Sequence, residues 1–318
     1  MKEYINKLGS EKRPFFFIIS YDMSESIVVP FDELDDSIKF EMDGFGISEK
    51  RQKTDQKTFI FEKFPQDFEI YSNKFNLLQN EIRAGNTYLA NLTMPTPISS
   101  NLSLLDIYEQ SKAKFKLYFK DIFVVFSPER FIKIKDNIIE TFPMKGTIDA
   151  SVKNAKEKIL NNQKELAEHT MVVDLLRNDL SIIAKKVKVE RFRYIDEVKT
   201  AQKTLLQVSS HIKGELEDNW SEHIGTILFS LLPAGSITGA PKKKSVEILK
   251  KIENYDRGFF SGVFGYFDGK ELDCAVMIRF IEKKDNKLIF KSGGGITADS
   301  DARQEYNELI EKVYVPIY

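Results

Sequence analysis

The sequence has few of the residues that form disulfides and hold zinc ions. It contains a single cysteine, Cys274, so neither an intrachain disulfide nor a cysteine-based zinc centre can form. Its three histidines, at positions 169, 211 and 223, do not give the H-x-x-x-H spacing of zinc hydrolases. A disulfide-stabilised scaffold is therefore excluded, and zinc-dependent hydrolysis is not indicated.

The sequence also lacks an excess of either charge and any long apolar run. Its 47 Lys and Arg residues against 48 Asp and Glu residues give a net charge of −1, which disfavours a protein that binds nucleic acid or anionic membranes. The apolar run at 15–19 is too short for a signal peptide, and the stretch at 224–234 is about half the length of a membrane span. We expect a soluble protein of a reducing compartment, the cytoplasm.

Material for a core is plentiful, since 42% of the 318 residues are hydrophobic and 12% are aromatic. Strand-like and helix-like runs are mixed along the chain without regular βαβ alternation. This pattern predicts an α+β fold with large, mostly antiparallel sheets. We expect one domain over residues 1–318.

Local patterns predict the individual elements. The run FFFIIS at 15–20 is typical of a strand, and residues 32–58 are polar and contain Gly44 and Gly46, so we expect them to be rich in loops. Apolar residues three and four apart predict a helix that starts at Gln66 and stops at Gly85-Asn86. Further along we expect a strand at 88–93 with a proline-bounded turn after it, four strands within 116–142, helices within 151–183, and a glycine loop at 293–295 before a closing helix near 300–314.

Two pairs of glutamates share one arrangement. Glu165 and Glu168 are three residues apart in ELAEHTMVVDLL and would lie on the apolar face of a helix. Glu305 and Glu308 repeat this spacing in RQEYNELIEK. Buried carboxylates need a cation or a raised pKa, and two such pairs suit Mg²⁺ completed by water and a substrate oxygen. The alternative is that they are ordinary glutamates near helix amino termini, where the helix dipole favours them.

Two glycine-rich segments precede predicted helices. One is Gly293-Gly294-Gly295 and the other is GSITGAP at 235–241. Both can present backbone N–H groups to an anion, although simple turns would explain either one alone. Neither matches the phosphate-loop or dinucleotide fingerprints, so a carboxylated small molecule fits better than a nucleotide.

Three single residues could carry chemistry. Lys145, just past a predicted strand end, would be a nucleophile or base if desolvation lowered its pKa. Glu129 in SPER would be a general acid if burial raised its pKa. Arg279 in AVMIRF, which is strand-like and apolar, needs a carboxylate partner from the protein or from a ligand. The alternatives are two solvated loop residues and a structural ion pair.

Taken together, these segments resemble the chorismate-utilising enzymes, the family of anthranilate synthase component I, aminodeoxychorismate synthase component I, and the isochorismate and salicylate synthases. The resemblance covers about residues 70–318 and has the family's order and spacing. It is carried by SPERF (127–131), FPMKGT (142–147), AEHTMVVDLLRNDL (167–180), AGSITGAPK (234–242), FSGVFGY (260–266), MIRF (277–280) and SGGGITADSDARQEYNE (292–308).

The resemblance implies the family's fold, in which two large sheets pack together, helices flank them, and the active site lies in a cleft between them. Residues 1–69 would be a shortened N-terminal region and 70–318 the chorismate-binding catalytic region. The implied Mg²⁺ ligands are Glu168 and Glu308, supported by Glu165 and Glu305, and the metal would hold the ring carboxylate of chorismate. The other implied substrate contacts are Gly146, Thr147, Ser236, Arg279, Lys312 and the backbone of Gly293 and Gly295.

Within the family, Lys145 is the informative residue. Anthranilate synthases have a small residue at this position, whereas aminodeoxychorismate synthases often have lysine. The resemblance implies that Lys145 adds at ring C2 while Glu129 protonates the departing C4 hydroxyl, after which ammonia attacks C4 and expels the lysine. We therefore expect an aminodeoxychorismate synthase component I, which makes 4-amino-4-deoxychorismate for p-aminobenzoate and folate. The alternatives are anthranilate synthase component I, an isochorismate or salicylate synthase, and a non-catalytic relative.

The implied reaction needs ammonia. Cys274 lacks the glycine-flanked elbow of an amidotransferase nucleophile, so we expect a separate glutamine amidotransferase subunit as partner. Two features depart from the family pattern. Many members have a histidine in the segment that reads LLQVSSHIKGEL here, where the chain has Gln207 and then His211. The region before residue 70 is also shorter than in the long members, so we expect no regulatory tryptophan pocket.

Overall fold

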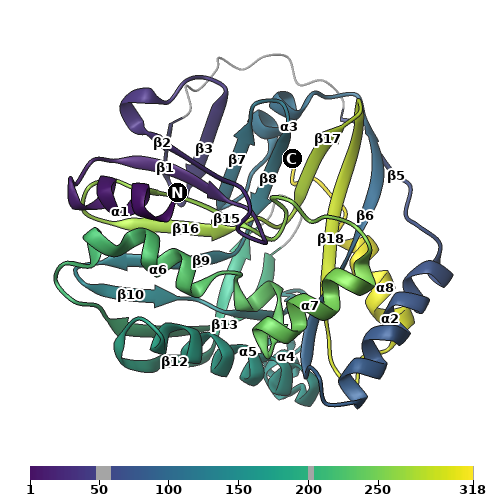
Figure 1. Cartoon of the computed structure of the whole chain (residues 1–318). Coiled ribbons are helices and arrows are strands. Elements are labelled where there is room, and N and C mark those ends of the chain that lie inside the picture. Colours follow the sequence, from purple (N-terminus) through teal and green to yellow (C-terminus); the bar gives the residue numbers. More distant parts are fainter. Residues whose placement is uncertain (48–58, 200–203, 318) are drawn as a thin grey trace.

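The computed structural model describes residues 1–47, 59–199 and 204–317, and two large antiparallel sheets organise them (Figure 1). The first, sheet A, contains in spatial order β11 (Met144–Asp149), β13 (Thr204–Glu215), β10 (Ile138–Thr141), β9 (Arg130–Lys135), β16 (Leu272–Val276), β15 (Val263–Phe267), β1 (Phe15–Ile19) and β2 (Ser26–Pro30), with β12 (Lys185–Lys199) paired to β13. The second, sheet B, contains β14 (Gly239–Ala240), β6 (Leu89–Ser100), β18 (Lys287–Ile296), β17 (Phe280–Lys284), β8 (Phe123–Ser127), β7 (Phe115–Phe119), β3 (Ile38–Met42) and β4 (Phe45–Ile47), with β5 (Phe61–Lys63) paired to β6.

The helices lie around these sheets (Figure 1). They are α1 (Lys2–Ser10), α2 (Phe68–Arg83), α3 (Leu104–Gln110), α4 (Ala155–Asn161), α5 (Gln163–Ser181), α6 (Ile224–Leu231), α7 (Lys242–Glu253) and α8 (Ala302–Glu311), with the short 3-10 turns η1 (Phe31–Glu33), η2 (Trp220–His223) and η3 (Gly235–Ile237). Among the described residues, none of the helices has the length and apolar character that a membrane crossing needs.

Strand β1 shows why the two sheets pack together. All five of its residues are buried, because successive side chains point to opposite faces and both faces are covered. Phe16 and Ile18 point into the core between the sheets, where Phe16 stacks on Phe40 of β3 with ring centroids 4.8 Å apart. Phe15 and Phe17 point the other way, into the core beneath the helices of sheet A. An uninterrupted apolar run therefore forms a strand at the centre of the layered structure.

The helices bury apolar stripes against the outer faces. Helices α1, α5 and α6 cover sheet A, whereas α2, α7 and α8 lie beside β6 and β18 of sheet B (Figure 1). The predicted stripe of α2 is correct, since Tyr71, Phe75 and Leu78 are buried there. Each buried side chain of this size contributes roughly 1.5–3 kcal/mol to stability.

Some sequence expectations were wrong. The region 32–58 contains a hairpin of β3 and β4 that was not expected; residues 48–58 lie outside the described part. The expected turn after residue 93 does not occur, since β6 continues through Pro95 and Pro97 to Ser100. The strands of residues 1–47 belong to both sheets: β1 and β2 extend sheet A, and β3 and β4 extend sheet B.

Candidate active site

Strand β11 places Lys145 on one wall of the site. The sequence indicated that Lys145 lies just past the end of a strand, but it lies within β11, opposite Val208 of β13. The register slips by one residue at Gly146, where φ is +69°. Only glycine adopts this conformation without strain, and a Cβ there would lie 2.9 Å from Oε2 of Glu165. The bulge thus brings β11 close against the first turn of α5.

The two glutamate pairs lie on two different helices, Glu165 and Glu168 on α5 and Glu305 and Glu308 on α8. The side chain of Asn162 caps α5 by accepting a hydrogen bond from the Glu165 N–H at 3.1 Å. Asp301 caps α8 in the same way. Burial separates Glu305 and Glu168 from ordinary helix glutamates, because Glu305 is only 5% exposed and the Glu168 side chain only 12%. Glu308, by contrast, lies at the open side of the cluster, with its side chain 56% exposed.

The carboxylates of the two helices influence one another. Burial, followed by the charges of Glu308 and Glu168, raises the pKa of Glu305, although Ser300 donates a hydrogen bond to it at 2.9 Å. Burial and the neighbouring carboxylates also raise the pKa of Glu168. Lys164 links the helices, since its Nζ lies 4.0 Å from Oε1 of Glu168 and 3.6 Å from Oε1 of Glu305. The raised pKa values and the contacts with Lys164 both relieve the repulsion between these carboxylates.

This arrangement fits Mg²⁺. Within the described ranges, no three Asp, Glu, His or Cys side chains are close enough to form a complete protein cage for a metal. Mg²⁺ does not need one, because it keeps several waters and takes one or two carboxylates together with substrate oxygens. The carboxylates that α5 and α8 present to one another are donors of this kind, with Lys164 as a cation that would compete for them.

Lys312 closes the side of the cluster formed by α8. Its Nζ lies 2.6 Å from Oε1 of Glu308 and donates to the carbonyl of Gly293 at 3.0 Å. Burial lowers the pKa of Lys312. Burial alone would raise the pKa of Glu308, but the charge and the hydrogen bond of Lys312 hold it below the ordinary value.

The three consecutive glycines are not a loop, as the sequence indicated, but the end of β18. Gly293 lies opposite Thr93 of β6, and Gly295 lies opposite Asn91. A Cβ on Gly293 would be 2.5 Å from Cγ2 of Thr93, so the close approach of β6 requires glycine there. A Cβ on Gly295 would be 3.2 Å from Nζ of Lys145. The end of β18 in sheet B therefore meets β11 of sheet A at Lys145.

Glu129 lies between β8 and β9, close to Lys145. Ser236 of η3 donates a hydrogen bond to its Oε1. Burial raises the pKa of Glu129, against the opposing effects of Ser236, Lys145 and Arg279. A raised pKa favours the protonated form that a general acid needs.

Arg279 is not in a strand, as the sequence indicated, but in a bend between β16 of sheet A and β17 of sheet B, with φ of +54°. Its Nε is buried and has no hydrogen-bond partner among the described residues. An unsatisfied buried donor costs about 1–3 kcal/mol, so this guanidinium is suited to receive a carboxylate from a ligand.

Most of the predicted site residues lie together. The charge of Lys145 acts on the pKa values of Glu129, Glu168, Glu308 and Lys312, which places these groups around one amine. Thr147 is exposed beyond the bulge, opposite Gln207.

His211 does not extend free into the site. Its Nε2 lies 2.7 Å from Oε1 of Glu140, and its ring stacks on Phe142.

Two residues of the site escaped the sequence analysis. Lys164 could have been found, because it is four residues before Glu168, the spacing of a helical ion pair. His169 could not. Burial, together with Arg193 and Lys145, lowers its pKa to about 4, and its Nε2 lies 2.7 Å from Oγ of Ser210 on a distant strand.

Comparisons with known proteins identify the family of the chain. The family model for chorismate binding enzymes matches residues 11–317. An uncharacterised PabA-like protein of Haemophilus influenzae is 48% identical over 319 residues, which cover 99% of this chain and 96% of that protein. Aminodeoxychorismate synthase component 1 of Salmonella typhimurium is 30% identical over 76% of this chain and 56% of its own length. Anthranilate synthase component 1 of Aquifex aeolicus is 34% identical over 58% of this chain and 38% of its own length.

A solved structure confirms the predicted fold class. The menaquinone-specific isochorismate synthase MenF of Escherichia coli superposes with a TM-score of 0.73 over 97% of this chain and 79% of its own, at 16% identity. At 16% identity, this similarity shows the fold alone. The chain spans little more than half of the aminodeoxychorismate synthase relative, which is 56% covered.

Proposed function

Since the chain belongs to the family of chorismate-binding enzymes, we propose that it is an aminodeoxychorismate synthase component I, which replaces the C4 hydroxyl of chorismate with an amino group. The observation that carries this proposal is the position of Lys145. Its amine lies against Gly295, and its charge acts on Glu129 and on the glutamates of α5 and α8. An enzyme amine at this place supports a reaction in which it adds to the ring.

In the proposed reaction, the amine of Lys145 forms a bond to ring C2. The two double bonds of the ring shift, and the C4–O bond breaks as Glu129 gives its proton to the departing hydroxyl, which leaves as water. Ammonia then forms a bond to C4, the two double bonds shift back, and the C2–N bond to Lys145 breaks. The protons released by the two amines restore Glu129 and the lysine. The net change is chorismate plus ammonia to 4-amino-4-deoxychorismate plus water.

The other residues would bind and orient the substrate. Mg²⁺, when bound, would supply positive charge for the ring carboxylate, and Glu168 and Glu308 would hold it with support from Glu165 and Glu305. Arg279, Lys312 and the backbone of Gly293 and Gly295 would bind carboxylates, since they offer cationic and N–H donors. Gly146, Thr147 and Ser236 would line the substrate.

We further propose that ammonia comes from a separate glutamine amidotransferase subunit, that the product enters p-aminobenzoate and folate synthesis, and that the protein is cytoplasmic. The number in the name of the Salmonella relative, component 1, supports a second component for that enzyme.

The second candidate is anthranilate synthase component I, which the 34% identity to the Aquifex aeolicus enzyme supports. The two candidates share most of the site and differ in the ring carbon that receives nitrogen. Direct addition of ammonia at C2 needs no enzyme amine, so this candidate gives Lys145 no role.

Product identity tests the proposal. The purified chain would be incubated with chorismate, MgCl₂ and an ammonium salt, and the products separated by chromatography and identified by mass spectrometry. We expect 4-amino-4-deoxychorismate from the wild type and a loss of at least about 100-fold in its rate with Lys145→Ala, the scale of a lost nucleophile.

Lys243→Ala, which removes an exposed lysine of α7, is the control and should retain wild-type activity. Anthranilate as the product, with Lys145→Ala fully active, would show that the second candidate is correct.

A further inference from the structure

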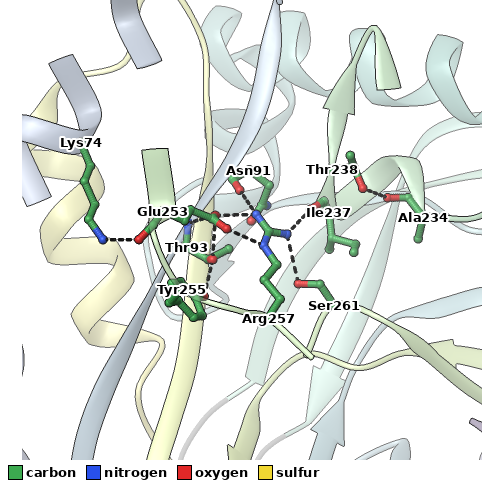
Figure 2. A network of polar contacts seen from close by, with 10 residues as sticks. All are labelled: Lys74, Asn91, Thr93, Ala234, Ile237, Thr238, Glu253, Tyr255, Arg257 and Ser261. Carbon is green, nitrogen blue, oxygen red and sulfur yellow. Dashed lines mark hydrogen bonds and ion pairs between the residues drawn. The ribbon is translucent and has the colours of Figure 1, made fainter. Parts of the chain in front are cut away.

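Figure 2 shows an ion pair between Arg257 and Glu253. Arg257 and Glu253 are both at most 3% exposed. The guanidinium meets the carboxylate with two hydrogen bonds, Nε to Oε2 at 2.8 Å and Nη2 to Oε1 at 2.6 Å. The ring of Tyr21 lies 4.4 Å from the guanidinium carbon and covers it. The arginine is therefore held rigidly, because a planar fork paired in this way has one orientation.

The remaining donors of Arg257 reach the main chain of two other segments. Nη1 donates to the carbonyl of Ile237 at 3.2 Å, and Nη2 donates to the carbonyl of Asn91 at 2.7 Å (Figure 2). Nη1 also lies 3.4 Å from Oγ of Ser261. One guanidinium therefore connects η3, β6 and the segment before β15, which are far apart in the sequence.

Both carbonyls belong to residues beside the proposed chemistry. Ile237 directly follows Ser236, whose hydroxyl donates to Glu129. Asn91 lies opposite Gly295, the residue against Lys145. The guanidinium thus fixes the backbone on two sides of the site without lying among the proposed substrate contacts.

Glu253 anchors the same part of β6. Its Oε1 accepts from the N–H of Thr93 at 2.9 Å and from the hydroxyl of Thr93 at 2.8 Å (Figure 2). Thr93 lies opposite Gly293 in the β6–β18 pairing. Lys74 of α2 donates to the carbonyl of Glu253 at 2.6 Å and ties the end of α7 to that helix. The acceptor that holds Arg257 is therefore itself fixed to the strand beside the glycines.

We infer that Arg257 is a positioning residue, which sets the orientation of the Ser236–Glu129 contact and the place of Gly295 against Lys145 through the carbonyls of Ile237 and Asn91. This inference rests on the proposed roles of Glu129 and Lys145. A residue that acts in this way changes the rate of the chemical step much more than the binding of substrate, because misplacing a reacting group by about 1 Å costs about 100-fold in rate.

The test uses Arg257→Lys, which keeps the buried positive charge but loses the fork of N–H donors that the planar guanidinium provides. Activity is followed as chorismate consumption, so the result does not depend on which amino product forms. We expect kcat to fall about 10- to 100-fold while KM stays within about threefold. Lys116→Met is the matched control, since Lys116 is a buried cation of β7 that bonds Ser111 and Glu41, neither of them a proposed site residue. The control should lose stability and keep kcat.

A second variant keeps the test valid if the single substitution unfolds the protein. Glu253→Gln/Arg257→Gln removes both buried charges, which costs less stability than leaving one unpaired. It still lacks the fork, so kcat should again fall with KM unchanged.

Combination with Ser236→Ala gives the decisive comparison. If Arg257 acts through Ser236, the losses in kcat from Arg257→Lys and Ser236→Ala will not multiply. Multiplying losses, a kcat that survives in the double glutamine variant, or an equal loss in Lys116→Met would overturn the inference. Formation of anthranilate by the wild type would refute the proposed function. The kcat and KM values of the variants could still be compared, because they are measured as chorismate consumption.

Discussion

The glycines of β18 allow stability and catalysis to be perturbed separately. Neither Gly293 nor Gly295 has a positive φ, so alanine at either position causes no backbone strain. Its cost comes from steric contact between the new Cβ and neighbouring atoms. A Cβ at Gly293 would lie 2.5 Å from Cγ2 of Thr93 and 2.8 Å from the carbonyl oxygen of Leu92. A Cβ at Gly295 would lie 3.2 Å from Cδ1 of Leu89 and 3.2 Å from Nζ of Lys145. The two substitutions therefore press on different kinds of atoms.

The expected magnitudes differ accordingly. Alanine at 293 must push back the β6 main chain, and such overpacking costs about 1–3 kcal/mol. For a chain of this size that lowers Tm by roughly 2–6 °C. Alanine at 295 meets only the ends of two side chains, so we expect a cost under about 1 kcal/mol. The Lys145 amine must move by several tenths of an ångström, however, and kcat should fall roughly 10-fold or more.

The assay combines thermal unfolding with steady-state chorismate consumption at saturating ammonium and Mg²⁺. Gly295→Ala should show a nearly wild-type Tm with a clear loss of kcat. Gly293→Ala should show the larger drop in Tm and is the matched control for disturbance of β18. If Gly295→Ala keeps full kcat, or loses as much Tm as Gly293→Ala, the contact between Gly295 and Lys145 does not govern the reaction.

Three further outcomes follow from the buried charges and the thiol. Burial raises the pKa values of Glu168 and Glu305 above the ordinary 4.5, so the folded protein holds their protons more tightly than the unfolded chain. The lowered pKa of His169 acts in the opposite direction, because its stabilising effect grows as pH rises from about 4 toward the ordinary 6.5, so the test compares the wild type with Glu168→Gln/Glu305→Gln, in which His169 is unchanged. Without metal, the free energy of unfolding of the wild type relative to this variant should fall as pH rises through the raised pKa values, and Mg²⁺ should reduce the fall; thermal scans from about pH 5 to about pH 8 check this, and a constant difference would contradict the argument. Lys164→Met should lower the metal-free Tm by no more than about 2 °C, because Lys164 is partly exposed. The same substitution should tighten Mg²⁺ binding measured by calorimetry, because it removes a cation that competes for the carboxylates. Weaker Mg²⁺ binding would contradict this role of Lys164. Cys274 is buried, and burial raises the pKa of its thiol, so thiol reagents should label it only after unfolding; rapid labelling of the native protein would contradict its burial.

Elements whose patterns are local could be predicted from the sequence. The stripe of α2 recurs every three or four residues because one face of the helix packs on sheet B, and FFFIIS is apolar throughout because β1 is covered on both faces. The i, i+3 glutamate pairs are also visible locally. That they lie near one another could be expected only from the family resemblance, since α5 and α8 are far apart in the sequence.

Elements that depend on distant strands could not be predicted. Glycine usually marks a turn, yet Gly293 to Gly295 continue a strand because β6 approaches them too closely for any side chain. Proline usually ends a strand, yet β6 runs through Pro95 and Pro97. Their carbonyls accept from the side chain of Gln66 and the N–H of Phe64 on the side of β6 away from β18, where a proline needs no N–H.

The position of Arg279 and Glu129 follows from how the two sheets are connected. The chain passes from sheet B to sheet A between β8 and β9, where Glu129 lies, and from sheet A to sheet B between β16 and β17, where Arg279 lies. Two main-chain hydrogen bonds connect the two crossings: the Val276 N–H donates to the Glu129 carbonyl, and the Phe126 N–H donates to the Arg279 carbonyl, each at 3.1 Å. At a crossing the chain leaves the ladder, so neighbouring strands do not cover these side chains. An acid and a cation are thereby placed at the junction of the sheets, where Lys145 and Gly295 also meet.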